Sequence, residues 1–165
     1  MKKIALLLLA FLMLCGCSRY GDNIKPILSG ISFTANISFY NEAFVCDGLI
    51  DKEHNLKLIV KEPENIEGLT FSVENEIVTA EYKGITYTPS TGASPFGSAA
   101  ENIYFVLSDA KERLYPVTRN ADSFIIQSAK DDAYYKITLA PTGLPLTLEY
   151  PSKGLTVSFM NLTII

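Results

Sequence analysis

The stretch that decides the fold is "ISFTANISFY", residues 31–40. Apolar and polar side chains alternate along it, since Ile, Phe, Ala, Ile and Phe occupy the odd positions and Ser, Thr, Asn and Ser most of the even ones. Strict alternation is typical of a β-strand with one buried and one solvated face. The stretch therefore predicts a sheet that is covered on one side only.

Short segments with the same alternation continue along the chain. About six strands are predicted between residues 31 and 88, joined by short turns such as Lys83-Gly84, and about four or five more follow later. In the last of them, "LTVSFMNLTII" (155–165), the apolar positions change phase, which predicts a β-bulge near Met160-Asn161. The strands therefore fall into two groups.

One helical segment separates these two groups. "PSTGASPFGSA" (89–99) is rich in Pro, Gly and Ser and is predicted to be a loop. Apolar residues then recur at helical spacing, which predicts an amphipathic helix from about Ala99 to Lys111 with Ser98 as its cap. A flat sheet of about ten or eleven strands cannot bury its apolar face against one helix. We therefore predict a mainly β fold, in which a curved antiparallel half-barrel wraps around the helix.

The composition is that of one folded domain. The chain has 165 residues, of which 48% are hydrophobic and 19% charged, so the apolar material suffices for a sizeable core. The formal net charge is -4 and the lysines are scattered, whereas a nucleic-acid-binding protein needs a basic stripe. We expect a monomer that does not bind nucleic acid.

The first residues have the character of an export signal. Lys2 and Lys3 precede the apolar run Ile4–Leu14, which is shorter than the ~20 residues that a membrane-spanning helix requires. A short basic start followed by such a run is typical of a signal peptide, and a transmembrane anchor is the less favoured alternative.

The sequence "LCGC" (14–17), which ends this run, resembles the lipobox of bacterial lipoproteins. The resemblance implies that a diacylglycerol is attached to the sulfur of Cys17, that the chain is cut before it, and that the protein is anchored to a membrane outside the cytoplasm. The predicted organisation is a signal peptide (1–16), a lipidated tether (17–29) and one domain (30–165). In a two-membrane host, a serine after the acylated cysteine would resemble the outer-membrane sorting signal.

Four stretches carry a second resemblance: "ISFTANISFY" (31–40), "EPENIEGLTFSVENEIVTAEYKGITYT" (62–88), "YYKITLAPTGLPLTLEY" (134–150) and "LTVSFMNLTI" (155–164). Together they resemble the half-barrel of the LolA/LolB type, the outer-membrane lipoprotein carrier and receptor proteins, and of related mycobacterial lipid-binding lipoproteins. The resemblance implies a cavity that takes acyl chains. None of the carrier's own functional residues is matched.

The candidate lining residues of such a cavity are apolar positions on the strands and the helix. They are Phe33, Ile37, Phe39, Leu58, Phe71, Ile103, Leu107, Leu146, Val157 and Phe159. The alternative is plain packing of these side chains in a core without a cavity, because any sheet needs an apolar face.

Residues for catalysis are few. His54 is the sole histidine and lies in the predicted turn "DKEHN", where we interpret it as solvated. No Ser/His/Asp set and no metal site can be assembled, so we expect no catalytic residues, no metal and no cofactor. Cys46, in the predicted strand "AFVCDGLI", is interpreted as a small buried residue. The expected class is a non-enzymatic lipoprotein that binds a hydrophobic or lipidic ligand, and the alternative is a structural or protein-interaction lipoprotein with a filled core.

Overall fold

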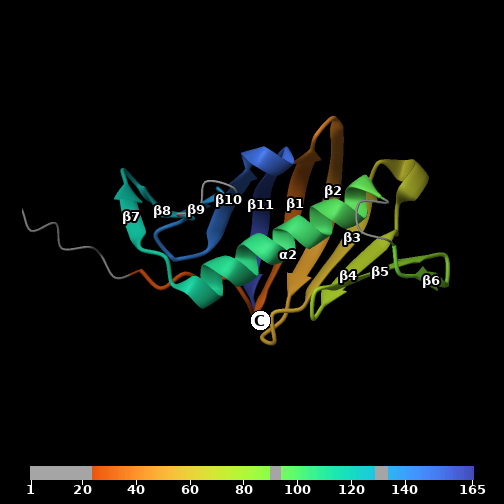
Figure 1. Cartoon of the computed structure of the whole chain (residues 1–165), viewed down its shortest axis with the longest axis horizontal. Helices are drawn as coiled ribbons and strands as arrows, with labels where there is room; N and C mark the ends of the chain where they lie inside the picture. The colour runs from red at the N-terminus through yellow and green to blue at the C-terminus, as the bar shows by residue number, and fades with distance from the viewer. Residues whose placement is uncertain (1–23, 90–93, 129–133) are drawn as a thin grey trace, which may run out of the picture.

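The computed structural model describes residues 24–89, 94–128 and 134–165, which form one curved antiparallel sheet with an α-helix across its concave side (Figure 1). Two 3₁₀ turns, η1 (Glu64–Ile66) and η3 (Pro151–Lys153), join strands. The strands are β1 (Ile31–Phe39), β2 (Glu42–Ile50), β3 (Leu56–Glu62), β4 (Thr70–Glu74), β5 (Ile77–Tyr82), β6 (Ile85–Tyr87), β7 (Val117–Asn120), β8 (Ser123–Gln127), β9 (Lys136–Leu139), β10 (Pro145–Tyr150) and β11 (Leu155–Ile164). The predicted fold class is confirmed.

The sheet is built from two meanders that meet in its centre. Its strand order is β6-β5-β4-β3-β2-β1-β11-β10-β9-β8-β7, so the first and last strands pair with each other and β6 and β7 form the edges. Helix α2 (Pro95–Arg113) connects these two edges and therefore has to cross a face of the sheet (Figure 1). It buries one apolar stripe, consisting of Ala99, Ala100, Ile103, Val106, Leu107 and Ala110.

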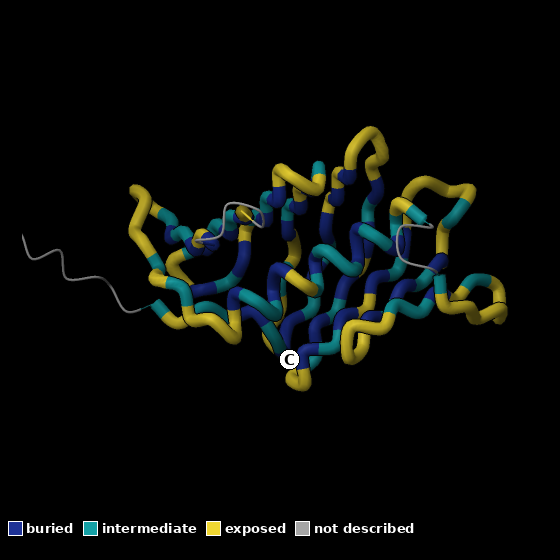
Figure 2. The backbone as a smooth tube through the Cα atoms, viewed as in Figure 1, coloured by how far each residue is buried: buried dark blue, intermediate teal, exposed yellow. Residues whose placement is uncertain are grey.

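The alternation of "ISFTANISFY" is realised in β1. The side chains of Ile31, Phe33, Ala35, Ile37 and Phe39 are all buried, and the residues between them are half-buried or exposed. Buried and more exposed positions alternate in the same way along the neighbouring strands (Figure 2). Among the described residues, the buried side chains join those of α2 in one continuous core.

The helix is longer than the sequence predicted. It begins at Pro95 instead of Ala99, and its cap is Ser94, whose Oγ accepts a hydrogen bond from the Gly97 amide at 3.4 Å. Proline suits the first turn because its fixed φ is helical and its missing N–H would have no partner there. The prediction of a loop up to Ala99 and of Ser98 as the cap was therefore wrong.

Within the described part of the chain, the register of the sheet shifts at three places: between β2 and β3 at Val45–Cys46, and at two further sites, in β11 and in β10. The shift in β11 confirms the prediction for the last strand, since Thr34 pairs with Met160 while Ser32 pairs with Thr163, and Asn161 between them has a φ of 50°. The shift in β10 lies between Pro145 and Thr147. An extra residue reverses which side chains face the core beyond it.

The N-terminal part of the described chain packs against the domain. The Ile27 amide donates a hydrogen bond to the Gly143 carbonyl at 2.9 Å, and Leu28 is buried in the core. Gly143 has a φ of 87°, and a Cβ there would lie only 2.4 Å from the Lys25 carbonyl oxygen, so glycine is required. Residues 24–29 of the predicted tether are thus part of the packed structure.

Candidate functional site

Nine of the ten predicted cavity residues lie together in the core between α2 and the sheet. Each is at most 6% exposed and belongs to the same hydrophobic cluster: Phe33, Ile37, Phe39, Leu58, Phe71, Ile103, Leu107, Val157 and Phe159. Ring contacts such as that of Phe33 with Phe159, 5.0 Å between centroids, show that this region is closely packed. Most of the predicted lining residues therefore form packed core.

Leu146 is the exception and corrects the prediction. It is 38% exposed, because the bulge between Pro145 and Thr147 turns its side chain away from the core. Leu148, two residues later, is completely buried. The alternation of leucines in "LPLTLEY" gave no sign of the extra residue.

Open hollows occur where the helix meets the rim of the sheet. The first, here called the aromatic hollow, has a volume of about 450 Å³ and lies beside the first half of α2. Its apolar lining comes from Phe39, Tyr40, Phe105 and Tyr150, and its polar lining from Ser98, Glu101, Asn102 and Lys153. The rings form two pairs, because Phe39 contacts Tyr40 at 4.8 Å and Phe105 stacks on Tyr150 at 6.2 Å between centroids.

A second hollow of about 340 Å³, the basic hollow, lies at the other end of the helix. The N-terminal segment, the last turn of α2, β7 and β8 contribute to it. Its lining residues are Lys25, Pro26, Leu28, Ser29, Ala110, Lys111, Leu114, Tyr115, Val117 and Ile126. Both hollows join residues from distant parts of the sequence, which is why the strand pattern alone did not indicate them.

The C-terminal end of α2 is fixed to the second meander by one carboxylate. Asp109 accepts hydrogen bonds from the hydroxyl of Tyr135 at 2.9 Å, from that of Tyr115 at 3.1 Å, and from the Arg113 guanidinium. Burial raises the pKa of the Asp109 carboxyl, but the hydrogen bonds from Arg113, Tyr135 and Tyr115 outweigh it and leave the pKa below its ordinary value. These contacts hold the helix against the sheet.

His54 is not solvated, contrary to the prediction. Its side chain packs beneath α2 and is only 8% exposed, with its ring 6.0 Å from that of Tyr104, and neither ring nitrogen has a hydrogen bond of normal geometry. Burial, and then the charge of Lys111, lowers the pKa of His54 to about 4. The imidazole is therefore neutral near pH 7 and acts as part of the core.

Cys46 is buried, as the sequence predicted. It is completely inaccessible, and burial together with the neighbouring Asp47 raises the pKa of its thiol to about 12. Within residues 24–89, 94–128 and 134–165 there is no cluster of His, Cys, Asp and Glu that could hold a metal ion. In the same part of the chain no helix has the length and apolar character to cross a membrane. Cys17 lies outside the described residues.

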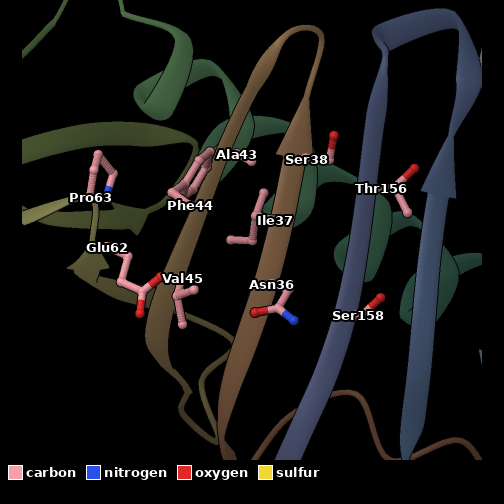
Figure 3. A pocket seen from close by; sticks show the side chains of 10 residues that line it. All are labelled: Asn36, Ile37, Ser38, Ala43, Phe44, Val45, Glu62, Pro63, Thr156 and Ser158. Carbon is pink, nitrogen blue, oxygen red and sulfur yellow. The ribbon is translucent and has the colours of Figure 1, made fainter.

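The face of the sheet turned away from α2 carries a further open hollow of about 350 Å³ (Figure 3). Asn36 and Ser38 of β1, Thr156 and Ser158 of β11, and Glu62 of β3 supply its polar groups. Ile37, one of the predicted cavity residues, also borders it, but its side chain is buried. Ala43, Phe44, Val45 and Pro63 supply the rest of its apolar lining, so this hollow mixes short polar groups with apolar side chains.

The chain is similar to solved structures but not to any family model or curated protein. Among solved structures, the chain is similar to a LolA superfamily protein from Nitrosomonas europaea, known from a crystal structure. The two share 9% sequence identity, the alignment covers 88% of this chain and 90% of that one, and the TM-score is 0.48.

Proposed function

We propose that this chain is a membrane-anchored lipoprotein of the cell envelope that binds a hydrophobic or lipidic ligand beside helix α2, without catalysing a reaction. The observation that carries the proposal is the pair of hollows at the rim of the helix–sheet interface, about 450 and 340 Å³ in volume. Both fall within the range of ~300–1,000 Å³ that is usual for small-molecule sites.

The dimensions of the fold explain why such hollows exist. Eleven strands spaced about 4.8 Å apart make a sheet roughly 50 Å across, whereas a helix with its side chains is only about 10–12 Å wide. A single helix covers part of the concave face, and apolar side chains such as Phe105 and Leu114 are left exposed at the margins. An apolar ligand that buried this surface would gain about 25 cal/mol for each Å² removed from water.

Ligand binding is tested with residues 18–165, which contain every core residue of the described part of the chain. We expect lipid to co-purify, and a fluorescent fatty acid to bind the protein after this lipid is extracted. Phe105→Ser and Leu114→Ser each remove an exposed apolar side chain from one hollow, and Ile85→Ser removes one from the edge strand β6 as the matched control. Loss of binding in at least one hollow variant supports the proposal, and binding unchanged in both contradicts it.

The anchoring part of the proposal is supported by the sequence "LCGC" and is tested separately. Cells expressing the full chain are grown with labelled palmitate, and membrane fractions are probed for the label. The wild type and Cys15→Ser should both carry the label in the membrane fraction, since only Cys17 occupies the modified position. A Cys17→Ser variant that is still labelled would contradict lipidation at Cys17.

A structural or protein-interaction role is the second candidate. The observation in its favour is the exposed apolar surface of the hairpin β5–β6 at the sheet edge, where Ile77, Ile85 and Tyr87 are 60%, 70% and 46% exposed. Uncovered edge strands pair readily with other chains. A photo-crosslinking residue at position 85 should capture a discrete envelope protein if this role holds. An adduct that forms equally from a denatured sample would speak against it.

A further inference from the structure

The basic hollow combines an apolar interior with an exposed entrance. Leu28, Ala110 and Ile126 in its wall are all at most 5% exposed, so packing in the core holds these side chains in place. Leu114, at its margin, is 83% exposed and ends α2 with a φ of 49°. An aliphatic chain lying in the hollow would therefore contact buried side chains on one side and cover Leu114 on the other.

The basic hollow is lined by positive charge, whereas the whole chain has a negative net charge. Its only charged lining residues are Lys25 and Lys111, and no carboxylate lines it, although the sequence has 18 acidic against 14 basic residues. In contrast, a hollow of about 460 Å³ lies between α2 and the β4–β5 turn. Its charged lining residues are Glu76, Glu101, Asp109 and Glu112, with Arg113 as its one cation.

Both ammonium groups are available to a ligand. Lys61 and Lys136 form ion pairs with Asp47 and Glu149, but neither Lys25 nor Lys111 has a hydrogen bond or ion pair among the described residues. The two lysines reach the hollow from different elements, Lys25 from the N-terminal segment and Lys111 from the last turn of α2. A ligand group between them would meet positive charge from two sides.

We propose that the basic hollow binds a single-chain amphiphile with an anionic headgroup, with its acyl chain against Leu28, Ala110 and Ile126 and its headgroup between Lys25 and Lys111. The inference rests on the proposed function and names the class of ligand and its site. The complementary charge selects the headgroup, because a carboxylate or phosphate gains from both ammonium groups while a neutral ester does not.

The test compares one acyl probe with and without its charge. Residues 18–165 are titrated at about pH 7.5 with dansyl-aminoundecanoic acid, whose carboxyl is then ionised, and with its methyl ester. We expect the acid to bind about tenfold more tightly, and about 0.5 M NaCl to reduce this preference. The Lys25→Gln/Lys111→Gln double variant should lose the preference while the ester binds as before. The control variant Lys153→Gln, in the aromatic hollow, should leave the preference for the acid over the ester unchanged.

Competing lipids then identify the headgroup. Palmitate and lysophosphatidic acid offer a carboxylate and a phosphate, and displacement of the acid probe by either supports the proposal. Lysophosphatidylcholine, which is zwitterionic, should compete more weakly, and equal competition would overturn it. Urea unfolding of the double variant verifies that it is folded.

The outcomes separate this inference from the proposed function. If acid and ester bind equally, or if the double variant keeps the preference, the basic hollow does not select an anionic headgroup, while hydrophobic ligand binding still stands. If neither probe binds, both proposals are wrong.

Discussion

The hydroxyl of Tyr135 donates a hydrogen bond to Asp109 Oδ2 at 2.9 Å, and this contact joins helix α2 to the second meander of the sheet. Tyr135 is completely buried just before β9, while Asp109 lies in the last turns of α2. Because Tyr115 and Arg113 donate to the same carboxylate, three donors meet at one group. The basic hollow opens beside this end of the helix, so its walls depend on the helix staying in place.

Asp109→Asn should destabilise the protein by about 2–3 kcal/mol, because the hydrogen bonds to the carboxylate lose their charge assistance. Urea unfolding measures the change, with Glu112→Gln as the control, since Glu112 is exposed on the same helix turn. Glu112→Gln should change the free energy of unfolding by no more than about 0.5 kcal/mol. The lowered pKa of Asp109 means that its contribution is present above the unfolded value of about 3.9 and is lost as the pH falls further. Equal costs for both variants would contradict the role of Asp109.

Gly48→Ala should destabilise the sheet by about 1–3 kcal/mol through overpacking. Phe33 is the registered partner of Gly48, and a Cβ at Gly48 would lie 2.1 Å from its ring. Phe33→Leu provides room, so the cost of Gly48→Ala should be smaller in that background. Unfolding midpoints of the four members of this double-mutant cycle measure the coupling. Strictly additive costs would show that the ring of Phe33 is not what requires glycine.

Stability should fall as the pH decreases from about 6.5 to about 4, through the protonation of His54 in the unfolded chain. The folded state disfavours the charged imidazole, because burial and Lys111 lower its pKa to about 4, and the loss should be on the order of 2–3 kcal/mol. His54→Asn removes the titrating group and suits the φ of 77° at this position. Urea unfolding across this pH range should therefore show a flatter profile for the variant, and an unchanged slope would contradict the assignment.

Leu148→Ala and Leu146→Ala should differ strongly in their effect, although both leucines lie in β10. Leu148 is completely buried and its truncation should cost about 2–5 kcal/mol, while the change at Leu146, 38% exposed within the bulge, should cost under about 1 kcal/mol. Thermal unfolding of the two variants gives the comparison. Similar losses at the two positions would be inconsistent with the bulge.

Cys46 should not react with thiol reagents while the protein is folded. Its side chain is inaccessible, and burial raises the pKa of its thiol to about 12, so almost no thiolate is present near pH 7. Residues 18–165 contain no other cysteine, and labelling is followed by mass spectrometry with and without urea. Fast labelling of the folded protein would show that the strand β2 opens readily.

The sequence by itself determined the character of most strands and the class of the fold. The alternation in residues 31–40, the helical spacing of Ile103 and Leu107, and the change of phase at Met160-Asn161 are local patterns. Each pattern reflects which side of its own element is buried, and that is why these predictions were confirmed.

Only the tertiary structure decided where Leu146 points, that His54 is buried, and which residues line the hollows. A single extra residue in β10 inverts its faces without changing the pattern of leucines, and the burial of His54 depends on a helix some fifty residues later in the chain. Lys25 and Lys111 meet at one hollow because β1 pairs with β11 and α2 must cross the sheet between its edges. Sequence periodicity records local exposure, whereas a site is made by contacts between distant segments, which only the pairing of the strands brings together.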